Sequence, residues 1–366
     1  MRVAIIGAGI VGSTCAYYLS KEKINITVFD HGEGQATKAS AGIICPWFSK
    51  RRNKAWYKMA RLGADFYSKL VEDLENDGYA SDFYKKTGVF LLKNDESKLE
   101  DLYDIAKARR EESTLIGDLK FLSAHEARER MADFSGAGRL IFAEGAARVD
   151  GQKLVDNLLA AAKVNRISKK VDIKKLGHAY EIDGQIFDKV ILATGAWLGQ
   201  ILEPLGYEVD VRPQKGQLRD YIIADKNTGD YPVIMPEGEF DIIPFSDGRV
   251  SVGASHENEM AYDLSVDNDL LDSYRRESEQ YLLSLKNAKI AKARVGIRAY
   301  TSDYSPFYGQ LETLENVYVA SGLGSSGLTT GTIIGYDLAM LLSGNETILN
   351  PSDYPVDRYV KKKDSL

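Results

Sequence analysis

The sequence has few cysteines and no long apolar run. Its 366 residues include two cysteines, Cys15 and Cys45, which have neither C-x-x-C spacing nor a neighbouring histidine. A zinc site or a disulfide framework is therefore disfavoured, and a reducing cytoplasm is the expected location. No stretch approaches the roughly 20 apolar residues of a membrane span, and the Lys-rich end KKKDSL is typical of a solvated tail. We predict neither a metal nor a membrane anchor.

An excess of positive charge is also absent. Lys and Arg number 47 against 53 Asp and Glu, which gives a formal net charge of −6 and a pI near 5.5. Proteins that bind nucleic acid present a basic surface to the phosphate backbone, so we expect no nucleic-acid partner. The chain is long enough for two or three domains and for a core that needs no disulfide or structural metal.

The N-terminal segment carries a glycine pattern typical of a dinucleotide-binding turn. The segment RVAII, apolar after its arginine, predicts a strand. GAGIVG follows at residues 7–12, and a helix is predicted from about residue 10. The first glycine permits a tight turn, Gly9 lets the backbone approach a pyrophosphate, and Gly12 lets helix and strand pack closely. Asp30, at the end of the second predicted strand, is placed to hold a ribose hydroxyl. The contacts expected here are Gly7, Gly9, Ile10, Val11, Gly12, Asp30 and His31.

This turn does not distinguish FAD from NAD, because both contain adenosine diphosphate. Four other segments bear on the choice: ATKASAGII at 36–44, KVDI at 170–173, VILATGAW at 190–197 and SGLGSSGLTTG at 321–331. With GIRAYTSDYSPFYG at 296–309, they make nearly the whole chain resemble the D-amino-acid oxidase family of flavoproteins, which includes glycine oxidase, sarcosine oxidase and D-amino-acid dehydrogenase. The resemblance implies FAD, held without a covalent bond because neither cysteine lies in the late segment that would carry one.

The resemblance also implies which residues meet the cofactor. The 36–44 loop would pass the phosphates and ribose and then the isoalloxazine ring, and the strand KVDI would present the backbone of Val171 to adenine. The helix after the 321–331 turn would stabilise negative charge on the reduced flavin through its N-terminus. The contacts implied are Thr37, Lys38, Ala41, Gly42, Ile43, Val171, Thr194, Gly195, Leu323, Gly324, Ser325, Ser326 and Gly327.

Arg298 and Asp241 are the candidate catalytic residues. Arg298 lies where the family has G-x-R-P-x-T-x-D-x-x-P-x-x-G, and a guanidinium can hold an amino-acid carboxylate through two hydrogen bonds. The alternative is a surface salt bridge. Asp241 stands where several members present a tyrosine, so it could hold an ammonium group, or it could be an exposed strand residue. Glycine oxidase has a second carboxylate-binding arginine where this chain has Ser325, which implies a weaker clamp or another substrate.

The fold class expected is α/β, with a Rossmann-like FAD-binding domain and an α+β substrate domain built on an antiparallel sheet, as in the D-amino-acid oxidase and glutathione-reductase-like FAD folds. We assign residues 1–80, 137–205 and 300–366 to the FAD-binding domain. Residues 81–136 and 206–299 are assigned to the substrate domain. Short strands with turn signals from about residue 212 to 254 suggest the second sheet.

The function expected is oxidation of the carbon–nitrogen bond of a small amino acid by hydride transfer to FAD. The substrate would be a D-amino acid, glycine or an N-methyl amino acid, and dioxygen or an electron carrier would reoxidise the flavin. An oligomer is compatible with the sequence. Two alternatives stay open at this point, an NAD-dependent dehydrogenase and a non-catalytic FAD-binding subunit of a larger complex. Bound flavin that amino acids cannot reduce would indicate the latter.

Overall fold

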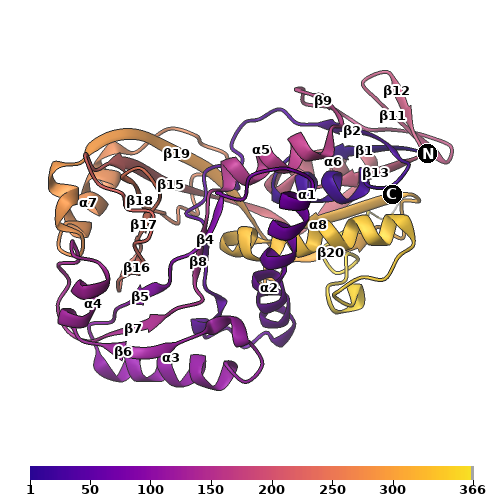
Figure 1. Ribbon diagram of the computed structural model, residues 1–366. Coiled ribbons are helices and arrows are strands. Elements are labelled where there is room, and N and C mark those ends of the chain that lie inside the picture. The colour runs from indigo at the N-terminus through magenta and orange to yellow at the C-terminus, as the bar shows by residue number, and fades with distance from the viewer. Residues whose placement is uncertain (364–366) are drawn as a thin grey trace.

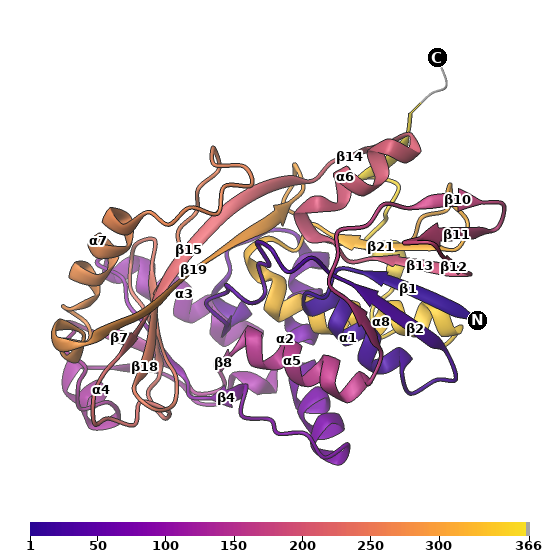
Figure 2. The same ribbon diagram turned by 90° about the horizontal axis from the view of Figure 1, so that it is seen from above.

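Two sheets organise the fold. In the computed structural model, which describes residues 1–363, one sheet surrounds the N-terminal strand and the other contains the long strands β15 (Arg212–Ile222) and β19 (Lys289–Tyr300) (Figure 1). Viewed from above, these two strands run side by side from the far end of the larger sheet to the part of the molecule that contains β1 (Figure 2). The second sheet is therefore anchored against the first by its two longest strands.

The first sheet, over the described residues, has the strand order β20–β21–β13–β1–β2–β9. All neighbouring strands are parallel except β20 and β21. This is the buried, mainly parallel arrangement that the apolar runs predict. The strands are β1 (Arg2–Ile6), β2 (Asn25–Phe29), β9 (Asn165–Ile167), β13 (Lys189–Leu192), β20 (Phe307–Gln310) and β21 (Val317–Ser321).

Helices cover one face of this sheet. Helix α1 is buried along its whole length, and α8 packs closely on it because the glycines of α8 leave room: a Cβ at Gly335 would lie 2.6 Å from the carbonyl oxygen of Val11. A three-stranded sheet and the short helix α6 cover the other face. The elements are α1 (Ile10–Leu19), α2 (Lys54–Asn76), α5 (Gly151–Ala162), α6 (Leu198–Leu202), α8 (Gly327–Ser343), β10 (Lys174–Leu176), β11 (Ala179–Ile182) and β12 (Gln185–Phe187).

The second sheet has the strand order β19–β15–β18–β17–β16–β5–β7–β6 within the described chain. The strands between residues 212 and 254 pair antiparallel, as expected, and the sheet becomes mixed where β16 pairs in parallel with β5 from a distant part of the chain. Helices α4 and α7 pack on one face and α3 on the other. The elements are β5 (Val89–Leu91), β6 (Leu119–Leu122), β7 (Leu140–Ala143), β16 (Val233–Met235), β17 (Asp241–Pro244), β18 (Arg249–Gly253), α3 (Glu96–Arg109), α4 (Ala124–Arg130) and α7 (Asn268–Ser278).

Strand pairing also bears on the expected domain boundaries. Strand β7 belongs to the second sheet, between β5 and β6, so a boundary between residues 136 and 137 would cut through that sheet. Two small sheets complete the chain, β3 (Ile43–Ile44) with β8 (Ala147–Val149) and β4 (Tyr84–Lys86), and β14 (Tyr207–Val209) with β22 (Val360–Lys362). Over residues 1–363, no helix has the length and apolar character required to cross a membrane.

We predict that Gly12→Ala lowers the free energy of unfolding by about 1–3 kcal/mol, the usual cost of overpacking. A Cβ at Gly12 would lie 1.9 Å from the carbonyl oxygen of Gly7, so α1 would have to move away from the glycine turn. Urea unfolding measures the effect. Gly199→Ala in α6 is the control, since its Cβ would meet the flexible end of Glu203 and would be in ordinary contact, at 4.0 Å, with Cβ of Val209. Equal stabilities for the two variants would contradict the prediction.

Candidate functional site

A cavity of about 920 Å³ is lined by residues of both sheets and their connections. On the side of the first sheet it is lined by the chain that follows β1, β2, β13 and β21, where parallel strands bring their carboxyl ends to one edge. On the other side it is lined by β19 and by residues 235–241. Its size is at the upper end of the range of about 300–1,000 Å³ for small-molecule and cofactor sites.

The glycine turn after β1 forms one wall through close backbone packing. Gly7 has a φ of +98°, and a Cβ there would lie 2.3 Å from the carbonyl oxygen of Ala193. Gly9 lines the cavity and begins α1, and the hydroxyl of Thr37 accepts a hydrogen bond of 3.0 Å from the Ile10 N–H. The N-terminus of α1 is therefore presented to the cavity, which favours an anionic group such as a phosphate.

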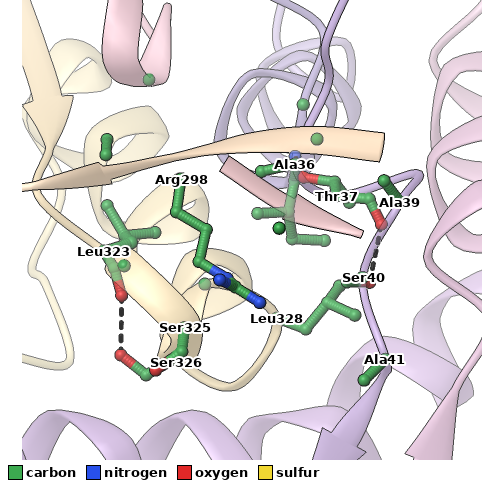
Figure 3. A pocket seen from close by; sticks show the side chains of 18 of the residues that line it. Ala36, Thr37, Ala39, Ser40, Ala41, Arg298, Leu323, Ser325, Ser326 and Leu328 are labelled. Atoms are coloured by element: carbon green, nitrogen blue, oxygen red, sulfur yellow. Dashed lines mark hydrogen bonds between the residues drawn. The ribbon is translucent and has the colours of Figure 1, made fainter. Parts of the chain in front are cut away.

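The loop that contains Thr37 runs along strand β19. The Ile297 N–H donates to the Gly34 carbonyl at 2.9 Å, and the Val149 N–H donates to the Gly42 carbonyl at 2.7 Å. Figure 3 shows Ala36, Thr37, Ala39, Ser40 and Ala41 following one another along this edge of the cavity. Because these side chains are small, the loop leaves the cavity open while its backbone stays close to it.

The cavity end beside β2 contains polar atoms without partners. Asp30 follows β2 and accepts a hydrogen bond from the Gln35 side chain. Among the described residues, Oε1 of Gln35 and Oγ1 of Thr194 are buried and have no hydrogen-bond partner. Leaving such atoms unpaired costs about 1–3 kcal/mol each, so a polar ligand is expected to satisfy them. His31 and Trp197 line the same end with their rings edge to face.

The prediction of a strand at residues 170–173 is wrong. Val171 lies in irregular chain between β9 and β10, because β9 pairs only with β2 at the sheet edge and β10 pairs with β11. Val171 is nevertheless buried and lines the cavity. Its position at the cavity therefore does not depend on strand pairing.

The last glycine turn closes the cavity near the start of α8. Residues Gly324–Ser326 form a 3₁₀ turn, and the Ser325 N–H donates to the Tyr300 hydroxyl at 2.9 Å. The Ser326 hydroxyl donates to the Leu323 carbonyl at 2.8 Å and accepts from Nε1 of Trp56 at 3.3 Å. These bonds hold the turn opposite Arg298, whose side chain extends from β19 into the space before it (Figure 3).

Arg298 has hydrogen bonds but no counter-ion. Its Nη1 donates to Oε1 of Gln214 at 3.0 Å and to the Ser255 carbonyl at 2.7 Å. Within residues 1–363 no ion pair with a carboxylate engages the guanidinium, and no hydrogen bond engages its Nη2. Burial lowers the pKa of Arg298. Gly216 makes room for the group, because a Cβ there would lie 2.6 Å from Cζ of Arg298.

Asp241 lines the cavity at the start of β17. Burial raises the pKa of this carboxyl to about 7, although attraction from the Lys93 ammonium group acts in the opposite direction. Lys93 and His256 also line the cavity. His256 is largely exposed at the cavity edge. Lys50 also belongs to the lining, and its ammonium group pairs with Asp101 at 3.4 Å.

The predicted site residues lie around this cavity, with two exceptions. Gly12 lies beneath the glycine turn, and Lys38 turns its carbonyl away toward Arg294. Sequence reasoning missed Gln214 and Gly216, which come from the strand beside Arg298 and belong to no motif. The sequence offers only one indication of these two residues, which is that Gly216 interrupts a strand pattern. A glycine in a strand can mark the close approach of another group. The remaining predicted residues are all in the lining: Gly7, Gly9, Ile10, Val11, Asp30, His31, Thr37, Ala41, Gly42, Ile43, Val171, Thr194, Gly195, Asp241, Arg298, Leu323, Gly324, Ser325, Ser326 and Gly327.

A strand–glycine turn–helix unit that opens onto such a cavity defines a dinucleotide-binding enzyme fold, and similarity to known proteins identifies its kind. Residues 2–341 match the family model described as FAD dependent oxidoreductase (DAO). The chain therefore belongs to this family, and the resemblance inferred from the motifs is confirmed. FAD is accordingly its cofactor, which removes the NAD-dependent alternative.

Individual relatives cover almost the whole chain. It is 37% identical to the uncharacterized oxidoreductase YurR of Bacillus subtilis (strain 168), over 96% of this chain and 97% of that protein. It is 26% identical to a glycine oxidase of Pseudomonas aeruginosa, over 96% and 98%. The crystal structure of an iminodiacetate oxidase from Chelativorans sp. BNC1 superposes with a TM-score of 0.91 at 30% identity, covering 98% of both chains. The expected fold is thus confirmed.

The cavity fits FAD on three observations. Its volume suits a large cofactor, its glycine turn brings the backbone to the start of α1, and the orphaned oxygens of Gln35 and Thr194 need polar partners. Residues near Asp30 would hold the adenosine part, and those near Arg298 and Ser325 would enclose the reactive ring.

Gly216→Ala should weaken the binding of a simple carboxylate probe such as benzoate about tenfold, a loss of roughly 1.4 kcal/mol. The added Cβ would displace the Arg298 guanidinium that lies against Gly216. Titration followed by the flavin absorbance measures the affinity. In a double-mutant cycle, Gly216→Ala should add little to Arg298→Ala, since both act through one group. Additive losses would show that Gly216 does not act through Arg298.

Proposed function

We propose that this protein oxidises the carbon–nitrogen bond of a small amino acid or N-alkyl amino acid, and that Arg298 binds the substrate carboxylate. The observation that carries the proposal is a guanidinium inside the cofactor cavity with no carboxylate partner among the described residues. A desolvated charge without a counter-ion is costly, so the site favours an anionic ligand. The free side of the fork suits a planar carboxylate.

The residues around Arg298 would orient the substrate. Gln214 and the Ser255 carbonyl fix one nitrogen of the guanidinium, which restricts the position of the bound carboxylate. The Ser325 turn, held by Tyr300, closes the opposite side. When bound, FAD supplies the hydride acceptor, and the protein supplies orientation and electrostatic stabilisation. The oxidised product is an imine, which water hydrolyses to an oxo acid and an amine or ammonia.

Relatives support a substrate with at least one carboxylate beside the amine. Glycine oxidase and iminodiacetate oxidase are the names of a sequence relative and of a structural neighbour. Glycine and iminodiacetate share an N–CH2–COO− unit, and this unit is what a single arginine clamp can select. Asp241 and Lys93, of opposite charge, would then contact the rest of the substrate. We also propose that the chain divides into an FAD-binding domain and a substrate domain. Strand β7 is assigned to the substrate domain, because it pairs with β5 and β6.

The proposal is tested first by an anaerobic visible spectrum of the purified protein with glycine, sarcosine, proline, iminodiacetate and D-amino acids. Bleaching of the flavin band by one of these amines is the expected result and would identify the substrate. A flavin that dithionite reduces but that no amine reduces would contradict the proposal and favour a non-catalytic FAD-binding subunit.

We expect Arg298→Ala to raise the KM of the reducing amine by roughly 10- to 100-fold, as loss of a charge-assisted hydrogen bond implies. FAD content should remain close to that of the unaltered protein. Steady-state kinetics and the flavin spectrum measure the two effects. Arg212→Ala is the control, because Arg212 lies at the start of the same strand as Gln214 but outside the cavity lining. An unchanged KM in Arg298→Ala would refute the assignment.

Asp241 should make substrate preference depend on pH. Its carboxyl, with a pKa of about 7, is neutral in acid and ionised in base. The ratio of kcat/KM for a basic amino acid to that for a neutral one should therefore rise several-fold between about pH 6 and pH 8. Asp241→Asn should remove this rise, and the neutral substrate serves as the internal control. A ratio that varies identically in both proteins would exclude a role for Asp241 in the substrate pocket.

A further inference from the structure

One face of strand β19 carries Arg294, Gly296 and Arg298. Residues two apart in a strand point to the same side, so these three follow one another toward the cavity. The 34–42 loop lies along the same stretch: a Cβ at Gly296 would lie 2.9 Å from Cα of Ala36 and equally close to Cβ of Ala39. We call residues 36–42 the flavin-side loop. Strand β19 contacts this loop directly and also carries the Arg298 guanidinium that would bind the substrate.

Arg294 connects this loop to the interior of the second sheet. Its Nη1 donates to the Ser40 carbonyl at 3.0 Å and to the Lys38 carbonyl at 3.3 Å. Its Nη2 donates to Oδ1 of Asp220 at 2.8 Å and to the hydroxyl of Ser251 at 2.9 Å. One guanidinium thus joins β19, β15 and β18 to two alternate carbonyls of the loop.

The partners of Arg294 are themselves fixed. Asp220 and Ser251 are fully buried and lie opposite each other on paired strands, and the Ser251 hydroxyl donates to Oδ1 of Asp220 at 2.6 Å. The side chain of Arg294 is 13% exposed, so its ion pair with Asp220 is largely protected from solvent screening. The guanidinium therefore has little freedom to move, and neither do the carbonyls that it binds.

The direction of these carbonyls matters for an anionic cofactor. A carbonyl oxygen that faced the cavity would bring negative partial charge toward the phosphates, whereas the Lys38 and Ser40 carbonyls accept hydrogen bonds from Arg294, which does not line the cavity. The next residues, Ala41 and Gly42, line the cavity. Binding the carbonyls on the outer side is thus compatible with a loop whose inner side accepts FAD.

Arg219, a buried arginine of the same sheet, provides a comparison for Arg294, because its partners lie far from the flavin-side loop in sequence. Arg219, on β15, is 3% exposed and pairs with Asp272, and its Nη2 donates to Asn268 at 2.7 Å. Both partners lie in α7, none of whose residues lines the cavity. Arg219 therefore carries the same charge as Arg294 and is more deeply buried, and within residues 1–363 it makes no hydrogen bond to the flavin-side loop.

We propose that Arg294 is a positioning residue that holds the 36–42 loop at a fixed place relative to Arg298. The inference rests on the proposed function for the role of Arg298, but the hold on the loop is independent of the substrate. Asp220 is the counter-ion that keeps Arg294 in place, and β19 is the element that the flavin-side loop and the substrate clamp share.

The test compares Arg294→Met, Arg294→Lys and Arg219→Met in the full-length holoenzyme. Arg294→Met should weaken FAD binding by at least about tenfold, the effect of losing a charge-assisted hydrogen bond, and should accelerate hydrogen exchange of backbone amides in residues 38–42. Arg294→Lys keeps the charge beside Asp220 but cannot bind both carbonyls as a fork, so it should restore stability more than FAD affinity. Arg219→Met should lower the unfolding midpoint without changing either loop readout.

The proposal is overturned if Arg294→Met and Arg219→Met lose stability alike while FAD affinity and exchange in the loop stay unchanged. If Arg294→Met does not fold, Arg294→Lys decides, since unaltered FAD affinity in that variant would also refute the proposal. FAD affinity and exchange require no turnover. A failure of all amines to reduce the flavin would therefore count against the proposed function and leave this inference standing.

Discussion

Backbone segments from distant parts of the chain meet around the cavity at distances that only glycine allows. A Cβ at Gly7 would lie 2.3 Å from the Ala193 carbonyl oxygen, and one at Gly42 would lie 2.0 Å from the Val149 carbonyl oxygen. These contacts set the separation between β1, β13 and the loop after β2, and hence the width of the cavity. Since packed backbone cannot yield as a side chain can, the position of the cofactor site depends on them.

The parts of the site that could be predicted from the sequence are those formed by residues that lie close together in the chain. The GAGIVG turn combines strand, glycines and helix within a few residues, and Arg298 lies inside a recognisable segment. Asp30 also follows from its place at the end of the second strand. In each of these cases the residues that determine the geometry are sequence neighbours, or the segment as a whole resembles that of a family.

The parts that could not be predicted depend on strand register. Gln214 lies opposite Arg298 because β15 pairs with β19, and no motif in either strand states that register. The parallel pairing of β16 with β5 brings together residues far apart in sequence, and it is this pairing that places β7 in the second sheet. A propensity-based reading assigns strands but leaves their partners undetermined.

The two guanidiniums on the inner face of β19 differ in their counter-ions, and this difference separates their roles. Arg294 is neutralised by Asp220 and directs its remaining hydrogen bonds to the Ser251 hydroxyl and to two backbone carbonyls, so an additional anion would gain little there. Arg298 is held only by neutral acceptors among the described residues, so the free-energy gain of an arriving carboxylate is larger. Because one strand carries both, a change that shifts β19 should alter the proposed substrate clamp at Arg298 and the flavin-side loop together. A change of substrate that leaves the loop in place should therefore begin with Asp241 and Lys93, because their side chains line the cavity without being carried by β19.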